Sequence, residues 1–185
     1  MDIQNIADCP TLPAVKNRQQ LERALKTDNE VIFLLFGDIL SVAELTESIH
    51  RAGKRAIVHL DLIGGLGSRE VAVDFIARTT KADGIISTKA ALIRRAQQLG
   101  LLAIQRVFLL DSISLENVLS QMDLQNPDFI EVLPGVIPSV IQEITEKTTT
   151  PLIAGGLIRS KQDVYQSLQA GAVAVSTSCQ AVWNM

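Results

Sequence analysis

The chain has 185 residues, of which 47% are hydrophobic, 20% are charged and 4% are aromatic. This length suits one domain with a sizeable core, and the apolar content excludes an intrinsically disordered chain. The net charge of −3 excludes a global basic field that would attract nucleic acid, and the seven aromatic residues offer no evident platform for stacking bases.

The N-terminal residues do not resemble a secretory signal, and no apolar run resembles a membrane span. Its start, MDIQNIADCP, lacks the basic and apolar regions of a secretory signal, and the longest apolar run, residues 31–36, is far too short to span a bilayer. Cys9 and Cys179 lie at opposite ends of the sequence and have no metal-binding spacing. We therefore expect a cytoplasmic protein that binds no membrane and has no metal site and no cofactor.

Short apolar runs alternate with amphipathic stretches along the chain. The amphipathic stretches carry apolar residues at helical spacing, as at Leu21, Ala24 and Leu25. The runs are rich in Val, Ile, Leu and Ala with little alternation, which is typical of parallel strands covered on both faces. They cover residues 14–16, 31–36, 56–61, 84–87, 101–105, 128–133, 152–154 and 172–176.

Several helix boundaries can be predicted from short local patterns. Ser41 with Glu44, and Ser160 with Asp163, have the spacing of a capping box at a helix N-terminus. Glycines at positions 53, 100 and 171 lie where the preceding helices should end.

Eight strands and seven or eight helices predict an α/β fold, a compact TIM-type (β/α)8 barrel with short loops, formed by residues 1–185 as one domain. Each unit has about 23 residues, fewer than in the typical barrel of roughly 250 residues. A doubly wound open sheet shares the same alternation and is the alternative fold.

An internal repeat favours the barrel. When residues 30–42 (EVIFLLFGDILSV) are aligned with residues 128–140 (DFIEVLPGVIPSV), six of the thirteen positions are identical. QLERAL resembles SLENVL, IGGLGS resembles AGGLIRS, and ISTK resembles VSTS, all in the same order. Chance similarity between apolar strands is the competing explanation. We interpret the chain as two half-barrels of four βα units each.

Polar residues follow most of the predicted strands, where a βα barrel carries its functional groups. His59 and Asp61 are two residues apart on one strand, so they should point to the same side. A network of buried ion pairs that only fixes the top of the barrel would place similar residues there. The candidate ligand-orienting residues are Lys16, His59, Asp61, Lys89, Gln105 and Glu131.

The segments AGGLIRS and VSTS predict a phosphate site after the seventh and eighth strands. Gly155 and Gly156 would let the backbone approach an anion, and Ser176, Thr177 and Ser178 would open a short helix with free N–H groups and hydroxyls. A glycine turn needed only for chain geometry is the alternative.

The first half of the chain offers a similar set of residues, which could form a second anion site. Gly64 and Gly65 correspond to the glycine pair, and Ser87, Thr88 and Lys89 correspond to the second segment. Lys89 would add a point charge to this site. A purely structural role for these residues is the alternative.

The same polar residues could also serve an enzyme. Glu131 could act as a base, Lys89 as a Schiff-base amine, and His59 or Asp61 as an acid, as in a phosphosugar isomerase or aldolase. However, no catalytic triad or metal-binding spacing is present in the sequence, and we assign no catalytic residue.

Several ordered segments together resemble the glycerol uptake operon antiterminator regulatory proteins. They are HLDLI, DGIISTK, QRVFLLDS, PDFIEVLPG with IPSVIQE, AGGLIRS and AGAVAVSTS, and the resemblance extends from Pro13 to Trp183. It implies a TIM-barrel-like cytoplasmic regulator that responds to glycerol 3-phosphate and binds the leader mRNA of glycerol genes to prevent premature transcription termination.

The resemblance directs attention to basic residues that could contact RNA. The candidates are Arg106, Arg159 and Lys161 near the barrel mouth and Arg94 and Arg95 on a helix, with Arg51, Lys54 and Arg55 at another helix end. We expect ligand binding to order residues 106–112 and so create the RNA surface. A homo-oligomer would enlarge the RNA contact area, but the sequence gives no oligomeric state.

Overall fold

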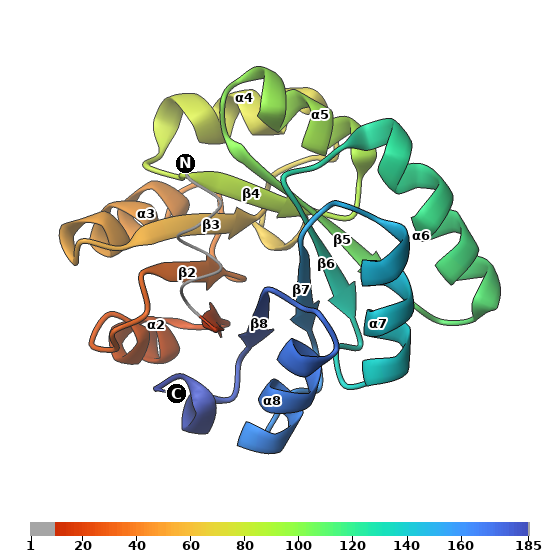
Figure 1. Ribbon diagram of the computed structural model, residues 1–185. Helices are drawn as coiled ribbons and strands as arrows, with labels where there is room; N and C mark the ends of the chain where they lie inside the picture. The colour runs from red at the N-terminus through yellow and green to blue at the C-terminus, as the bar shows by residue number, and fades with distance from the viewer. Residues whose placement is uncertain (1–9, 185) are drawn as a thin grey trace.

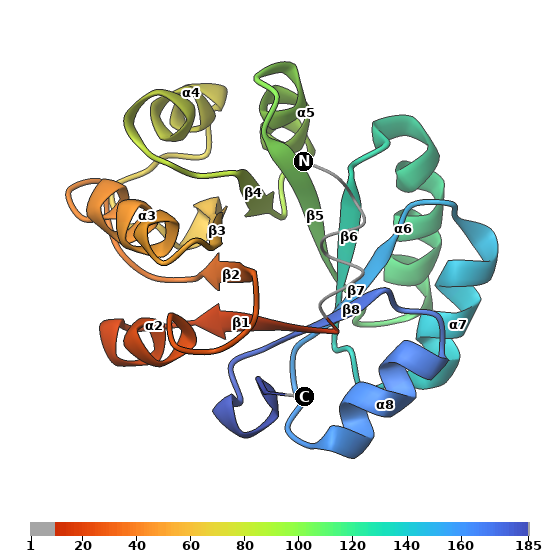
Figure 2. The ribbon, with the colours of Figure 1, turned by 60° about the vertical axis from the view of Figure 1, so that its left-hand side comes forward.

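Eight parallel strands form one closed barrel in the order of the sequence (Figures 1 and 2). The computed structural model describes residues 10–184, except the side chains at positions 117 and 121–125; the N-terminal segment and Cys9 lie outside these residues. The strands are β1 (Thr11–Val15), β2 (Val31–Leu34), β3 (Arg55–His59), β4 (Gly84–Ser87), β5 (Leu102–Phe108), β6 (Phe129–Leu133), β7 (Leu152–Gly155) and β8 (Ala174–Thr177).

Helices connect the strands and surround the barrel (Figure 1). They are α2 (Arg18–Ala24), α3 (Val42–Arg51), α4 (Glu70–Thr79), α5 (Ala90–Gln98), α6 (Ser112–Gln125), α7 (Pro138–Lys147) and α8 (Lys161–Gln169), with 3-10 turns η1 (Leu60–Leu62) and η2 (Gln180–Val182). None of the described helices is long and apolar enough to cross a membrane. Because β8 pairs with β1, the predicted TIM-type barrel is confirmed and the open sheet is excluded.

Every strand except β4 differs by at least one residue at one end or both from the sequence prediction; among the larger differences, β8 begins two residues later, at Ala174. β1 begins three residues earlier than predicted. β2 ends two residues earlier because the chain turns at Gly37, which has φ +113°. β3 ends two residues earlier because η1 follows it directly. β5 continues three residues further, to Phe108, which pairs with Leu133 of β6. Polar residues at positions 105 and 106 do not end this strand, since Arg106 points into the barrel, where it has a partner.

One of the two predicted capping boxes is confirmed. The Ser160 hydroxyl accepts from the Asp163 N–H at 3.1 Å, and the Asp163 carboxylate accepts in return from the Ser160 N–H. The box at Ser41 is wrong, because its hydroxyl donates to the Asp38 carboxylate at 2.8 Å and Glu44 pairs with Arg18 instead. The three predicted helix-ending glycines are confirmed, each with a positive φ.

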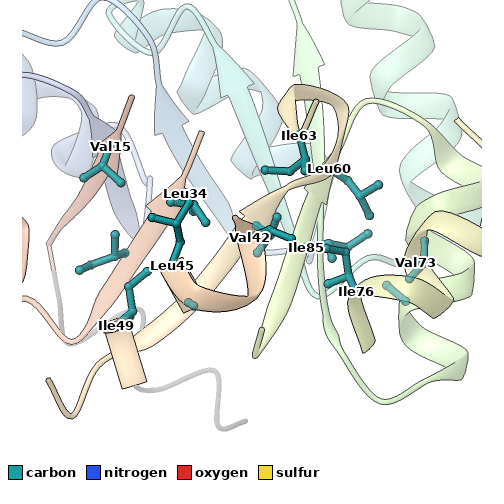
Figure 3. Packing of buried hydrophobic residues seen from close by; sticks show 14 of the residues in the cluster. Val15, Leu34, Val42, Leu45, Ile49, Leu60, Ile63, Val73, Ile76 and Ile85 are labelled. Atoms are coloured by element: carbon teal, nitrogen blue, oxygen red, sulfur yellow. The ribbon is translucent and has the colours of Figure 1, made fainter. Parts of the chain in front are cut away.

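The apolar residues form an inner and an outer core. The inner core fills the barrel with alternate strand residues, such as Phe33, Ile57 and Phe129. The opposite faces of the strands pack against the helices, in one cluster for the first half of the chain (Figure 3) and another for the second half. Both faces of each strand are therefore buried, which explains why the strands show little alternation in the sequence.

The internal repeat has a counterpart in the loops. In the first half, the Gly64 N–H donates to the Gly37 carbonyl at 2.9 Å, and in the second half the Gly135 N–H donates to the Gly155 carbonyl. These are the glycines that the repeat aligns with one another. The halves differ in two respects. The aligned glycines exchange the roles of donor and acceptor, and η1 separates β3 from Gly64 whereas Gly155 is the last residue of β7.

Two helix-ending glycines provide a test of this geometry. A Cβ at Gly171 (φ +105°) would lie 2.7 Å from the Thr145 hydroxyl oxygen, whereas a Cβ at Gly53 (φ +73°) would meet nothing within 4 Å. Gly53→Ala should lower the free energy of unfolding by about 1–2 kcal/mol through backbone strain alone. Gly171→Ala should lower it by a further ~1–3 kcal/mol through the clash. Urea unfolding of both variants measures the difference; equal losses would contradict it.

Candidate functional site

A polar layer closes the C-terminal end of the barrel. Within the barrel, inward-pointing residues recur every second position along each strand. The residue two positions beyond the last inner-core residue of each strand therefore also points inward, and it lies near the C-terminal end of that strand. These residues are Lys16, Leu35, His59, Thr88, Arg106, Glu131, Gly155 and Ser176. Six of the eight carry polar side chains, so the apolar interior ends in a polar floor at the mouth.

A buried ion pair lies at the centre of this layer. The Arg106 Nε donates to Glu131 Oε2 at 2.6 Å, and Ser176 donates its hydroxyl proton to Glu131 Oε1. Glu131 is fully buried and Arg106 is 8% exposed. Gly155 makes room for this arrangement, because a Cβ there would lie 2.8 Å from Glu131 Oε1 and 2.7 Å from the Ser176 hydroxyl oxygen. Gly155 thus lets the carboxylate and hydroxyl meet, a role that the sequence pattern did not suggest.

His59 sits in the same layer as an uncharged base. Its side chain is 3% exposed, and its Nδ1 has no hydrogen-bond partner. Burial, and then the positive charge of Arg106, lower the pKa of His59 from 6.5 to about 4. The imidazole is therefore neutral at physiological pH, and the fixed cation beside it is Arg106.

A cavity of about 550 Å³ opens above the ion pair, a size typical of small-molecule sites. Its polar wall includes Arg106, Glu131, Lys16 and Arg159. The two terminal nitrogens of Arg106 make no hydrogen bond within the described part of the chain and are not enclosed. The remaining lining residues are Ala14, Leu35, Leu62, Leu133, Gly156, Leu157, Ile158, Ser176, Thr177, Ser178 and Cys179.

Four of the five predicted phosphate-binding residues line this cavity, and Gly155 lies beside it under the ion pair. Thr177 uses its hydroxyl locally, donating to the Ile158 carbonyl at 2.8 Å and accepting from the Cys179 N–H at 3.0 Å. The Ser178 hydroxyl makes no hydrogen bond with another described residue. The expected helix at Ser176 is wrong, because β8 continues to Thr177 and only the short turn η2 follows, from Gln180.

The predicted second anion site holds a carboxylate of the chain itself. Asp61 accepts hydrogen bonds from the Ser87 hydroxyl (3.0 Å), the Thr88 N–H (2.8 Å) and hydroxyl (3.0 Å), and the Lys89 ammonium (3.1 Å). Burial alone would raise the pKa of Asp61, but these hydrogen bonds hold it below its ordinary value. The donors expected to bind an external anion are therefore already engaged, in a cluster that we call the Asp61 cluster.

The structure thus divides the predicted ligand-orienting residues. Lys16 and Glu131 line the cavity, whereas Asp61 and Lys89 belong to the Asp61 cluster. Gln105 donates to the Thr88 carbonyl at 3.0 Å, next to that cluster. Among the described residues, no group of three His, Cys, Asp or Glu side chains is placed to hold a metal ion.

Comparison with known proteins identifies the family. The profile of the family described as Glycerol-3-phosphate responsive antiterminator matches residues 11–183. The chain belongs to this family. A protein of uncharacterized function from Escherichia coli K12, YgcP, is 41% identical over 176 residues, which cover 95% of this chain and 92% of that relative.

Solved antiterminator structures resemble the chain over nearly its whole length. A glycerol uptake operon antiterminator regulatory protein from Listeria monocytogenes superposes with a TM-score of 0.90 at 36% identity, covering 94% of both chains. An antiterminator-related protein from Thermotoga maritima gives a TM-score of 0.85 at 31% identity, covering 95% of this chain and 98% of that one. A deoxyribose phosphate aldolase from Aeropyrum pernix, 15% identical with a TM-score of 0.68, shares the fold alone.

The candidate RNA-binding residues of this chain do not form one surface. Arg106 is buried in the cavity floor, and Arg159 lines the cavity wall. Lys161 begins α8, whereas Arg94 is exposed on α5. Arg95 of α5 pairs with Asp74 of α4 at 2.6 Å. The environment of Arg106 suits contact with a small ligand rather than with a macromolecule.

Sequence reasoning missed the apolar wall of the cavity, which includes Leu62 and Leu157. Leu62 reaches the cavity from η1, the turn that the Asp61 cluster holds in place. Leu157 has φ +62°, an unusual backbone conformation for a residue with a side chain. The sequence signal that could have indicated this turn is the glycine pair directly before Leu157, because glycines are common in turns that contain residues with positive φ.

Titration of His59 gives a prediction for this site. The unfolded chain binds a proton on His59 below pH 6.5, but the folded chain does so only below about pH 4. The stability of the wild type should therefore fall between these values, by up to about 3 kcal/mol from this group. His59→Gln, which cannot titrate, should gain stability relative to the wild type by that amount as pH falls from 7 to 4. Urea unfolding at several pH values measures the difference; a constant difference would contradict a neutral buried His59.

Proposed function

We propose that the protein is a cytoplasmic antiterminator that binds glycerol 3-phosphate in the cavity at the mouth of the barrel and, in response, binds the leader mRNA of glycerol genes. The observation that carries the proposal is the Arg106 guanidinium. Its Nε is fixed by the buried Glu131, and its two terminal nitrogens are left for a ligand in the cavity. A guanidinium oriented in this way presents a planar fork that suits a phosphate.

The charges around the cavity match those of a phosphate monoester. Arg106, Lys16 and Arg159 contribute three positive charges and Glu131 one negative charge, so the lining has a net charge of +2. A phosphate monoester carries about −1.5 to −2 at pH 7. In the described residues, neither the Lys16 ammonium nor the Arg159 guanidinium forms an ion pair, so both are available to the ligand.

The loops after β7 and β8 support the placement of the phosphate. Gly156, with φ +76°, and the hydroxyl of Ser178 lie on the same wall of the cavity as Arg159. This is the position at which βα barrels commonly bind phosphate. Glu131 lies below with both carboxylate oxygens engaged, by Arg106 and Ser176, so its part in the proposal is to orient the guanidinium.

The family supports the RNA half of the proposal, since its members are described as antiterminators. Ligand binding can promote RNA binding only if the ligand has a higher affinity for the RNA-competent state. The segment 106–112 joins Arg106 in the cavity to the start of α6. Residues 106–108 are already held in β5, so we propose that residues 109–112, the short connection to α6, carry the response when the phosphate engages Arg106.

Calorimetric titration with glycerol 3-phosphate tests the site. Arg106→Lys keeps the charge next to Glu131 but loses the planar fork, so affinity should fall at least ~10-fold. The matched control is Arg95→Lys, which alters an ion pair of the same 2.6 Å length on the outside of the barrel. Its affinity should stay within about threefold of the wild type.

Three outcomes would contradict the proposal. The two variants could lose affinity equally, glycerol without phosphate could bind as well as the phosphate ester, or the ligand could be turned over. The last result would favour the phosphosugar enzyme that the pocket residues also suggested. Retention of leader RNA, measured with and without the ligand, tests the response itself.

A further inference from the structure

The charges of the chain are segregated although its net charge is only −3. Residues 10–100 contain thirteen basic residues (Lys and Arg) and ten acidic residues (Asp and Glu). Residues 101–184 contain four basic and eight acidic residues. Because the strands follow one another in sequence order, these two segments form opposite sides of the barrel (Figure 2). One side of the molecule is therefore positive and the other negative.

The unpaired cations of the positive side gather at the N-terminal end of its strands. Lys26, Arg51, Arg55, Arg78 and Lys81, which we call the basic face, lie where α2, α3 and α4 end or where β3 begins. Four of these residues are exposed and Arg55 is partly exposed. None of the five forms an ion pair with another described residue.

Hydrogen bonds join the loops of the basic face into one surface. The Lys54 ammonium donates to the carbonyls of Thr27 (2.5 Å) and Asn29 (2.6 Å), which ties the loop after α3 to the loop after α2. The Lys81 N–H donates to the Thr46 hydroxyl at 3.2 Å, which ties the loop after α4 to α3. The three helices are neighbours around the barrel in both views (Figures 1 and 2).

Carboxylates do not balance this surface. The connecting loops carry Asp28, Glu30 and Asp83. Asp83 is already engaged, since its carboxylate accepts from the Ala56 N–H and contacts the His50 ring, both at 2.8 Å. Together with Lys54, the basic face places six cations against these three carboxylates and Glu22, which lies in the last turn of α2. Asp74, one turn before Arg78, is already paired with Arg95.

In the second half of the chain, the N-terminal end of the strands carries no such excess of cations among the described residues. Its only cation within the described residues around the ends of α6 and α7 is Lys147, which pairs with Glu143 at 2.7 Å. Asp128 and Glu146 add negative charge there. A polyanion approaching the N-terminal end of the barrel is therefore attracted to one side only.

The basic face also lacks apolar anchors. Leu99, 37% exposed, is the only large exposed apolar residue described at the N-terminal end of the barrel. Protein partners bind through such anchors, whereas a nucleic acid can be held by phosphate contacts alone. Eight of the eleven described residues of this kind surround the mouth instead: Ile39, Leu40, Leu62, Phe108, Leu110, Ile113, Ile137 and Leu157.

We propose that the basic face binds the phosphate backbone of folded RNA. This inference rests on the proposed function. It places the RNA contact at the end of the barrel opposite the mouth, where the sequence candidates Arg51 and Arg55 lie, rather than at the candidates near the mouth. β3 carries Arg55 at one end and His59 of the polar layer at the other, about 13 Å apart for an extended strand. The ligand and the RNA therefore bind at the same time and do not compete.

Two of these cations have a second role that the experiment must separate. Arg51 and Arg78 lie in the last turns of α3 and α4, where a positive charge also stabilises the helix dipole. Thermal unfolding of each variant, and its titration with glycerol 3-phosphate, show whether fold and ligand site are intact before RNA affinity is compared.

The test removes three cations from the basic face in Arg51→Gln/Arg78→Gln/Lys81→Gln. The control, Arg94→Gln/Lys147→Gln/Lys161→Gln, removes the same charge from the helices of the rest of the barrel. Affinity for a leader transcript of a glycerol operon is measured over a range of salt concentrations with glycerol 3-phosphate present. The first variant should lose at least ~10-fold in affinity, and its slope of log K against log salt should fall by about two, at ~0.7–0.9 per lost phosphate contact.

Each other outcome overturns the proposal in a distinguishable way. Equal losses in both variants would mean that net charge alone matters, and a loss confined to the control would place RNA on the other helices. If the wild type retains no RNA at all, the proposed function itself fails. If it instead binds vesicles of anionic phospholipid through the basic face, the partner is a membrane.

Discussion

The mouth of this barrel depends on the buried pair of Arg106 and Glu131. Two charges at this depth are stable only because each satisfies the other and because Ser176 binds the remaining carboxylate oxygen. Gly155 has no side chain because one would occupy the space of that carboxylate. His59 is kept neutral beside the pair, mainly by its burial. The floor of the cavity is thus rigid and carries one oriented guanidinium.

The closed barrel explains why these residues meet although they are distant in the sequence. Parallel strands in sequential order place their C-terminal ends around one opening, and the alternation of each strand decides which residue points inward. Arg106, Glu131 and Ser176 come from β5, β6 and β8, and Lys16 follows β1. The other end of the barrel, where helices finish and strands begin, is chemically different and carries cations that form no ion pair with other described residues.

Much of the architecture could be predicted because it depends on local patterns. Apolar runs gave eight strands, and Ser160 with Asp163 gave a real capping box. Ser41 has the same spacing, but a nearby Asp38 binds its hydroxyl, and spacing alone cannot show such a competitor. For the site, residues of the segments after β7 and β8 line one cavity, and phosphate binding there stays a prediction. The engagement of Lys89 with Asp61 and of Arg106 with Glu131 depends on contacts between different strands, which no single segment reveals.

The Asp61 cluster makes the two similar halves of the barrel chemically different. In the first half, η1 carries a carboxylate to the donors of Ser87, Thr88 and Lys89, where it occupies the place that an external anion would need. In the second half, Glu131 fixes the Nε of Arg106 and leaves the rest of the guanidinium toward the cavity. One half of the barrel therefore supplies its own anion, whereas the other presents part of a cation to the cavity.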